Sequence, residues 1–384
     1  MSKINVRSFS NENEDGAPDI VGVSTFSATS YFVPTRGTTA QRPSDHVEGG
    51  SIRFNTDTKN LEYYRGNTIG WSQFDLIDPD LGGGTGSNTG LGTRALFGGG
   101  HSPGYVDTID FVTISTLGNA QDFGDFVGND RGFGGGASSR TRALFMGGYT
   151  GSAKDNIDFN IFASLGNSTD FGNLVAANSR PKGMAADQVR ALFAGGDQQP
   201  GTRAVATIDF VTMAQEGNAV DFGDLTAACR SGTSSTMGSS TRGIFAGGNN
   251  NPTSVATIDF VTVATTGNAS DFGDLTAATT QAGAFSNSTR GVLGGGQSPT
   301  NTNKIEFIEI ATTGNATDFG DRTNSVEQVA GASSPTRGIF AGGNPYTDVI
   351  DFVEILTTGN ATDFGDLTDG RRGISGASNG HGGL

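Results

Sequence analysis

The chain is poor in the residues that build disulfides, metal sites and membrane spans. Its 384 residues include one cysteine, Cys229, and three histidines, and no run of eighteen apolar residues occurs. One cysteine cannot form an internal disulfide, and a spanning helix needs a longer apolar run. The first fifteen residues have no apolar core of a signal peptide. We therefore expect no membrane insertion, no signal peptide, and synthesis in a reducing cytoplasm.

Basic residues are also scarce. The chain has 24 Lys and Arg against 39 Asp and Glu, which gives a formal charge of −15. An acidic protein gains nothing from binding a polyanion, so we expect no nucleic-acid partner. The Gly-Gly-Gly runs lack the Lys-Ser/Thr of a phosphate loop. Carboxylates recur singly rather than in clusters, and we expect no metal and no cofactor.

The chain contains one sequence motif that is repeated six times. It reads T-R-A-L-F-G-G-G, then T-I-D-F-V-T, then G-N-A-Q-D-F-G-D in the first copy. Its arginine recurs at steps of 48, 48, 52, 48 and 47 residues. These positions are Arg94, Arg142, Arg190, Arg242, Arg290 and Arg337. Such a period indicates a repeat architecture.

Each copy predicts four short strands, here called a, b, c and d. Strand b holds Leu-Phe, c holds Ile-Asp-Phe-Val and d holds Asp-Phe-Gly-Asp. Strand a is weaker, as in 131–137 and 184–186. Four strands in about 48 residues is the size of one propeller blade. The first copy lacks a preceding strand a, and 371–379 supplies one after the last copy. We therefore predict an all-β, six-bladed propeller over 93–384, closed by the C-terminal strand.

Phenylalanine marks the same repeat. Three positions per copy are aromatic in all copies but one, where Leu293 takes the first place. Buried together, these rings would form the layer that holds neighbouring blades. The positions are Phe97, Phe111, Phe123, Phe145, Phe159, Phe171, Phe193, Phe210, Phe222, Phe245, Phe260, Phe272, Phe307, Phe319, Phe340, Phe352 and Phe364.

Three segments precede the repeats. Residues 1–50 are polar and predict an extended arm, and 79–92 form a Gly-rich linker. Between them, 51–78 predict a small β-meander, with turns at D-T-K-N and N-T-I-G. So small a sheet is marginal alone and needs another surface. We therefore expect an oligomer, or docking on a larger body.

The repeats resemble those of kelch proteins. Gly-Gly follows a hydrophobic strand, a hydrophobic-Asp-aromatic strand comes next, and a basic residue precedes strand a in four copies. The last two copies have Gln281 and Gln328 there, and Phe stands where kelch repeats usually have Trp. The basic residues are Arg131, Arg180, Arg230 and Arg371. The resemblance implies a kelch-like propeller.

A second resemblance concerns the meander. The segment I-R-F-N-T-D-T-K-N-L-E-Y-Y-R-G, followed by Trp71, is similar to one near the N-termini of tailed-phage virion proteins of the tail-fibre, adhesin or capsid-decoration type. Residues 30–43 resemble what often precedes it. The resemblance implies location in a virion, with other virion proteins bound through residues 1–78. It implies no catalytic residue.

The loops between strands b and c differ in length and content from copy to copy. Recognition on a repeat scaffold is usually carried by such loops. Exposed aromatic side chains there can stack on a sugar or fill a protein pocket. We predict a host-surface glycan or protein as ligand, bound by Tyr105, Tyr149, Tyr346 and His101. The alternative is that these loops only face solvent.

Two further sets of charges repeat. The six strand-b arginines predict a ring, either ion-paired with the last Asp of strand d or open as an anion site. The acidic residue of strand c predicts structural pairing; it is Asp110, Asp158, Asp209, Asp259, Glu306 or Asp351.

Two other functions fit a six-bladed propeller. A glycan-processing enzyme needs an acid, base or nucleophile set near the axis, and no such set is visible. An intracellular kelch-like scaffold explains the repeats but not the meander. We therefore expect a virion component that is not an enzyme.

Overall fold

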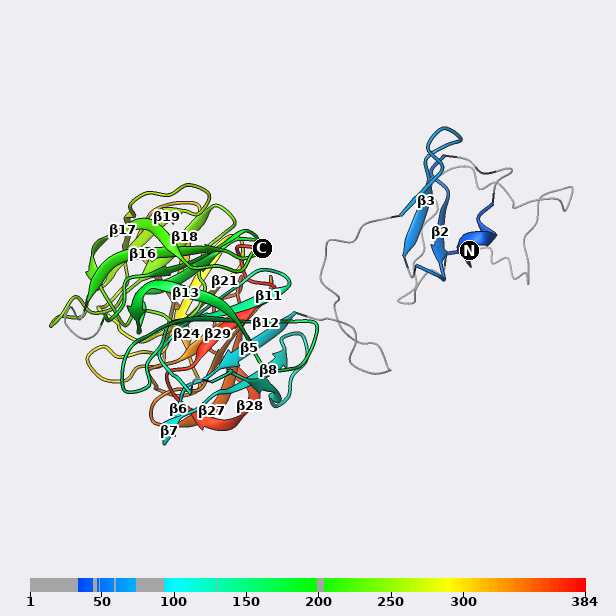
Figure 1. Cartoon of the computed structure of the whole chain (residues 1–384). Helices are drawn as coiled ribbons and strands as arrows, with labels where there is room; N and C mark the ends of the chain where they lie inside the picture. Colours follow the sequence, from blue (N-terminus) through cyan, green and yellow to red (C-terminus); the bar gives the residue numbers. More distant parts are fainter. Residues whose placement is uncertain are drawn as a thin grey trace, which may run out of the picture. The chain divides into compact units, whose positions relative to one another are not determined.

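The computed structural model describes residues 34–43, 47, 49–58, 60–73, 93–128, 130–198 and 204–384. Most of the predicted arm and the whole predicted linker lie outside these residues. The chain divides into two compact units, 1–78 and 79–384 (Figure 1). The described residues contain β-strands and one short 3-10 helix, with no α-helix. None of their helical segments is long and apolar enough to cross a membrane.

The first unit is a four-stranded sheet in the order β1-β2-β3-β4. Strands β2, β3 and β4 form the antiparallel meander expected from the sequence, and β1 adds to β2 in parallel. Within the predicted arm, Arg36 and Gly37 therefore pair with the meander. The elements are β1 (Arg36–Gly37), the 3-10 helix η1 (Thr39–Gln41), β2 (Ile52–Asn55), β3 (Leu61–Tyr64) and β4 (Trp71–Gln73).

The second unit contains six antiparallel sheets, in which strands run in the order a-b-c-d. The first is β29 (Ser375–Ser378), β5 (Arg94–Gly98), β8 (Thr108–Thr113) and β9 (Gln121–Asp125); the second is β10 (Gly135–Ser138), β11 (Arg142–Met146), β12 (Lys154–Ile161) and β13 (Thr169–Asn178); the third is β14 (Gly183–Ala186), β15 (Arg190–Ala194), β16 (Val205–Thr212) and β17 (Val220–Cys229). The fourth is β18 (Arg242–Ala246), β19 (Thr257–Thr262) and β20 (Ser270–Asp274); the fifth is β21 (Gly283–Ser286), β22 (Arg290–Gly294), β23 (Lys304–Glu309) and β24 (Thr317–Asp321); the sixth is β25 (Ala330–Ser333), β26 (Arg337–Ala341), β27 (Thr347–Glu354) and β28 (Thr362–Arg371). A small hairpin, β6 (His101–Ser102) and β7 (Gly104–Tyr105), follows β5.

The C-terminal strand completes the first sheet, as predicted. Strand β29 pairs antiparallel with β5, with Ser378 opposite Ala95 and Ser375 opposite Gly98. Figure 1 shows the two strands side by side, β29 in red and β5 in cyan. The pairing joins the first repeat to residues almost three hundred positions later in the chain.

The fourth sheet corrects the expectation of four strands in every copy. It has only three, β18, β19 and β20. Its counterpart of strand a, 233–238, pairs with β18 through the antiparallel bridge of Gly238 to Gly243 and the bond from Ile244 N to Met237 O, at 3.0 Å, but forms no regular strand. The same segment makes parallel bridges to residues of other repeats: Thr233 to Ala282, Thr236 to Met184 and Ser235 to Gly376. Small Ser and Thr side chains allow this, because the neighbouring backbones approach too closely for larger ones. A Cβ on Gly376, for example, would lie 2.3 Å from the carbonyl oxygen of Gly331.

A circle of backbone hydrogen bonds links all six repeats. One residue per repeat has a left-handed backbone, with φ between 50° and 64°, and donates its N–H to the carbonyl of the corresponding residue before it. The donor–acceptor distances lie between 2.7 and 3.0 Å. The circle is complete because the first member donates to the last. Its members are Phe133, Arg180, Ser231, Gln281, Gln328 and Gly373.

The G-N turns and D-F-G strands of neighbouring sheets form a second set of links. Gly166 N donates to Phe123 O at 2.8 Å, and Asn167 Oδ1 accepts from Asp125 N at 3.1 Å. The same pair of bonds recurs between every two successive sheets, and Asn119 and Phe364 make it between the first and the sixth. In five of the six turns the glycine has a positive φ, the Asn of the turn has none, and its side chain binds the neighbouring sheet.

The strand-b arginines are also links between sheets, and the predicted pairing with strand-d aspartates is wrong. Each guanidinium donates to a carbonyl at the end of strand c in the next sheet, as Arg337 does to Ile114 O at 3.1 Å. Each also lies 4.1 to 5.1 Å from the ring of its own strand-c Phe. Only Arg290 and Arg337 form ion pairs among the six, with Glu309 and Glu354.

The phenylalanines pack in edge-to-face pairs within each sheet. The strand-c ring meets the strand-d ring at 5.7 to 6.2 Å between centroids in all six sheets. The strand-b rings are completely buried; Phe97 and Phe340 have no exposed surface. Edge-to-face contacts stabilise by about 0.5 to 1.5 kcal/mol beyond the area that they bury. The repeated aromatic positions therefore form the core, as the sequence predicts.

The strand-c acids form ion pairs, also as predicted, in five of the six sheets, and four of these pairs are buried. The partner cations lie 2.5 to 3.0 Å away: Arg371 for Asp110, Arg131 for Asp158, Lys182 for Asp259, Lys304 for Glu306 and Arg322 for Asp351. Asp209 is the exception. Among the described residues it accepts only the backbone N–H of Val175, at 3.1 Å. Burial raises the pKa of Asp209 to about 6.

The grouping of four basic residues on the kelch pattern is therefore wrong. Arg131 and Arg371 are buried cations of the strand-c pairs. Arg180 is a member of the backbone circle, and Arg230 directly precedes another member. The four arginines thus hold three different places: Arg131 and Arg371 lie two residues before a member of the circle, Arg230 lies one residue before, and Arg180 is itself a member.

Residues 380–384 pack against the strand-a segments. His381 is buried; its Nε2 donates to Ser138 O at 2.7 Å, and its Nδ1 accepts from Gly383 N at 3.1 Å. Gly382 N donates to Ser286 O at 2.9 Å, which brings in the fifth sheet. Burial lowers the pKa of His381 to about 4, so the imidazole is neutral at pH 7.

Candidate functional site

The four residues predicted to bind a ligand lie together. His101 and Tyr105 face each other across the β6–β7 hairpin, with ring centroids 5.0 Å apart. Tyr346, from the sixth sheet, stacks on His101 at 5.8 Å, and its hydroxyl is hydrogen-bonded to His101 Nδ1 at 2.8 Å. Tyr149, from the second sheet, meets the Tyr105 ring at 5.9 Å. The b–c loops of three sheets thus build one aromatic cluster, which we define as these four residues.

Two arginines border the aromatic cluster. Arg372 lies over the Tyr346 ring at 5.1 Å and donates to Asn344 Oδ1 at 3.2 Å. Arg180 lies 5.2 Å from the Tyr149 ring and 4.6 Å from the Phe133 ring. Burial, together with the charge of Arg372, lowers the pKa of His101. The cluster is therefore an uncharged aromatic surface at pH 7, with a fixed cation on either side.

A polar groove adjoins the cluster at Tyr149. It has a volume of about 400 Å³, within the range of ligand sites. Two guanidinium groups share one carboxylate in it: Arg230 Nη1 is 2.8 Å and Arg180 Nη1 is 3.7 Å from Asp197 Oδ2. Burial lowers the pKa of Arg180, an effect that Asp197 opposes. The polar groove is lined by Tyr149, Arg180, Asp197, Arg230, Ser231, Asn249, Ser254, Thr280, Gln281 and Gln297.

A second, much smaller cavity lies beside the backbone circle. Its volume is about 40 Å³, enough for a water molecule but not for a sugar. All six members of the backbone circle line it. Arg180, Ser231 and Gln281 line both this cavity and the polar groove.

Sequence reasoning did not assign Arg180, Arg230 and Asp197 to a site. All three belong to segments that differ between copies: Asp197 begins the longest b–c loop, in the 52-residue repeat, and the arginines depart by one residue from the spacing of Arg131. The signal in the sequence that could have identified these three residues is their departure from the repeat. In the described residues, no three His, Cys, Asp or Glu side chains converge as ligands for a metal ion.

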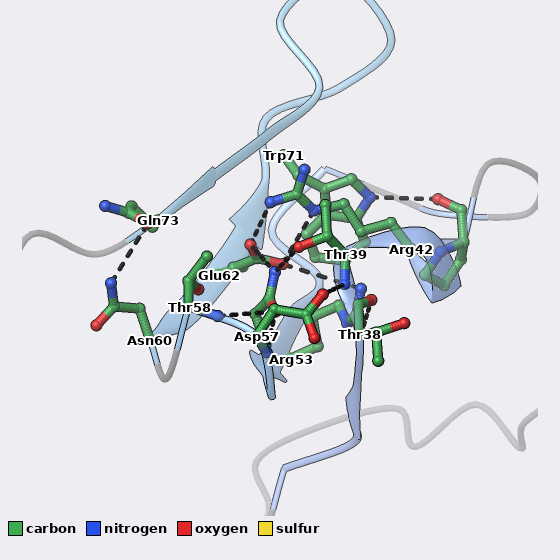
Figure 2. A network of polar contacts seen from close by, with 12 residues as sticks. Thr38, Thr39, Arg42, Arg53, Asp57, Thr58, Asn60, Glu62, Trp71 and Gln73 are labelled. Carbon is green, nitrogen blue, oxygen red and sulfur yellow. Dashed lines mark hydrogen bonds and ion pairs between the residues drawn. The ribbon is translucent and has the colours of Figure 1, made fainter.

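The motif residues of the first unit build a different kind of centre, a buried polar network (Figure 2). Glu62 has no exposed surface and is hydrogen-bonded by Arg42 and, at 2.7 Å, by Asn55 Nδ2. Arg53 Nη1 lies 3.9 Å from the same carboxylate. The Arg42 guanidinium keeps the pKa of Glu62 below its usual range. The carboxylate thus holds the segment before β2 onto the sheet.

Further bonds extend this network. Asn55 Oδ1 accepts the backbone N–H groups of Asp57 and Thr58, which shapes the turn after β2. Asp57 Oδ2 in turn accepts from Thr39 N at 2.8 Å. Trp71 Nε1 donates to Pro43 O at 3.2 Å. The polar residues of the I-R-F-N-T-D-T…L-E-Y-Y segment therefore have a structural role.

Comparison with known proteins does not assign the chain to a family. No protein-family model matches the sequence, and no curated protein is significantly similar to it.

Proposed function

We propose that this chain is a non-enzymatic structural component of a tailed-phage virion, whose repeats form a six-bladed kelch-like β-propeller that binds a host-surface glycan or protein. Residues 1–78 attach it to other virion proteins, and the chain assembles as a homo-oligomer. The observation that carries the binding role is the aromatic cluster, because four predicted residues from three repeats meet on one surface.

Three features support the propeller. The backbone circle has one member from each repeat, the turn-to-strand links run from each sheet to the next, and the arginine links follow the same cyclic order. A cyclic order of six sheets with no free end is what a propeller requires.

The buried network supports the attachment role of the first unit. The side chains of Arg53, Asn55 and Glu62 all point to the same face of the sheet formed by β2 and β3. Residues 38–43 cover that face. The opposite face carries Ile52, Phe54 and Leu61, and Ile52 is 52% exposed. A four-stranded sheet whose inner face is polar has little apolar core, so it gains stability from docking.

Purified particles test the location. An antibody against residues 93–384 should label every particle in electron micrographs, and the chain should appear in particle proteomes. Its absence from washed particles would overturn the virion assignment.

Binding to the host is tested with the purified full-length chain. Host cells should bind less than about a tenth as much of the triple variant Tyr105→Ala, Tyr149→Ala, Tyr346→Ala as of the unaltered chain. The reason is that each aromatic anchor contributes about 1 to 2 kcal/mol to the binding free energy. Leu117→Ala, on an exposed c–d turn, is the control. Equal binding by the triple variant and the unaltered chain would remove the recognition role.

A further inference from the structure

The polar groove next to the aromatic cluster carries more positive charge than its own carboxylate can neutralise. Arg180 and Arg230 share the single acid Asp197, and no other acidic residue lines the groove among the residues that the structure describes. Arg372, on the other side of the aromatic cluster, has a neutral partner, Asn344. This local excess of cations stands on a chain of net charge −15. A second anion placed here would therefore be attracted.

The groove also has unused hydrogen-bonding capacity. Arg230 Nε and Asp197 Oδ1 are buried and have no hydrogen-bond partner in the described part of the chain. Asp197 is only 1% exposed, so its orientation is fixed by its surroundings. A buried donor and a buried acceptor without partners lower the stability of the protein unless a bound molecule satisfies them.

The other lining residues fit a saccharide better than a peptide. They are the amides of Asn249, Gln281 and Gln297 and the hydroxyls of Ser231, Ser254 and Thr280, and none has an aliphatic side chain. The groove therefore offers no apolar pocket to an aliphatic side chain of a peptide. Amides and hydroxyls match sugar hydroxyl groups, and Tyr149 offers an aromatic face at one end.

We propose that the polar groove binds an acidic saccharide, with the sugar carboxylate on Arg230 and Arg180, a sugar hydroxyl on Asp197 and a sugar ring against Tyr149. Guanidinium groups bind carboxylates through paired N–H donors, which gives both strength and direction. The class includes uronic acids and nine-carbon sialic acids of cell-surface glycans. This inference rests on the proposed function, because it names the ligand class for the same face.

Direct titration of the full-length chain tests it. The probes are oligosaccharides of matched length that end in glucuronate, in N-acetylneuraminate, or in glucose as the carboxyl-free counterpart. An acidic probe should bind at least about tenfold more tightly than the glucose probe, the effect of roughly one charge-assisted bond. Its affinity should fall as salt rises, because ions screen the contact.

Four variants locate the contact. Arg230→Gln and Arg180→Gln should each weaken acidic-probe binding about tenfold, and Arg230→Lys should restore part of it, since it keeps the charge but not the fork. Arg140→Gln makes the same charge change at an exposed site between strands a and b and should leave binding unchanged. Thermal denaturation of each variant establishes that the fold is retained.

The outcomes separate the two proposals. Equal affinity for acidic and glucose probes, or wild-type affinity in Arg230→Gln, overturns the acidic-sugar inference and leaves the recognition role standing. Binding of an acidic peptide with no binding of any saccharide overturns the inference in favour of a protein ligand. If neither saccharides nor host cells bind, the proposed recognition role fails with it.

Discussion

Phe133 donates its backbone N–H to the carbonyl oxygen of Gly373, 2.7 Å away, and so joins the second sheet to the residues that lead into the C-terminal strand. The bond spans 240 positions in sequence, yet its geometry equals that of the bonds between consecutive repeats. Repeats with only local contacts would not produce it. It is the reason that loops of the first, second and sixth sheets meet in one aromatic cluster.

The contact between the sixth and first sheets predicts a strong effect of one methyl group. Gly365 has a φ of 147°, and a Cβ there would lie 2.6 Å from the backbone of Gly118. Gly365→Ala should therefore lower the free energy of unfolding by about 1 to 3 kcal/mol, as strained positions do. Urea denaturation measures this. Gly104→Ala, with nothing within 4 Å, is the matched control and should change stability little.

Asp209 predicts a substitution that stabilises the protein. Its pKa is raised from 3.8 to about 6, so the folded chain binds a proton more tightly than the unfolded chain does, and stability falls as pH rises through this window. Asp209→Asn should remove that loss and stabilise the fold at pH 7 by about 1 to 3 kcal/mol. The gain should vanish near pH 4.

The ion-paired acids provide the contrast for that experiment. Asp351→Asn leaves the fully buried Arg322 without a counter-charge and should destabilise by about 3 to 5 kcal/mol. If both variants destabilise equally at pH 7, Asp209 is paired in solution and the prediction is wrong.

His381 predicts a loss of stability in acid. Its pKa falls from 6.5 in the unfolded chain to about 4 in the folded one, so below pH 6.5 the unfolded state binds the extra proton. The folded state should lose about 3 kcal/mol between pH 6.5 and pH 4 from this group. In His381→Gln this component should be missing from a series of urea midpoints. An identical pH slope in the two proteins would show that the imidazole is not buried.

The buried carboxylate of the first unit predicts selective unfolding. Glu62→Gln leaves Arg53 and Arg42 without a counter-charge, a change that costs about 3 to 5 kcal/mol in a buried pair. Trp71 is the only tryptophan of the chain, so its fluorescence reports on this unit alone. We expect a Glu62→Gln emission maximum like that of the denatured chain, and a native one in Arg65→Gln, where an exposed charge is removed. Native emission from both would contradict a structural role of the network.

Much of the fold follows from the repeat. The strands of Leu96, Ile109 and Phe123 have turn residues on either side and recur in step, so local pattern alone locates them. The bridge partners of 233–237 cannot be predicted from the sequence, because Ser and Thr pair equally well with any neighbouring backbone. The function of Asn167 does not follow either, since a turn Asn that binds another sheet looks like any turn Asn.

The candidate site likewise contains some residues that the sequence identifies and others that only the structure identifies. Tyr105, Tyr149 and Tyr346 are visible because they stand in loops that vary. Arg180 and Arg230 are not, because the sequence does not show where the left-handed residue of each repeat falls. Relative to that residue, Arg180 stands two positions later than Arg131 and Arg230 one position later, and both therefore reach the groove and not a buried pair. Asp197 joins them only through the tertiary structure.

The closure of the six sheets is tested most directly by one crosslink. Ala95 and Ser378 are opposite each other in β5 and β29, and opposed residues of antiparallel strands have Cβ atoms about 4.5 to 5.5 Å apart, close to disulfide range. The measurement is mass spectrometry of the oxidised Ala95→Cys, Ser378→Cys variant. We predict a disulfide between positions 95 and 378 of the same chain, in a natively folded protein. Free thiols at both positions, or disulfides only between chains, would contradict the account.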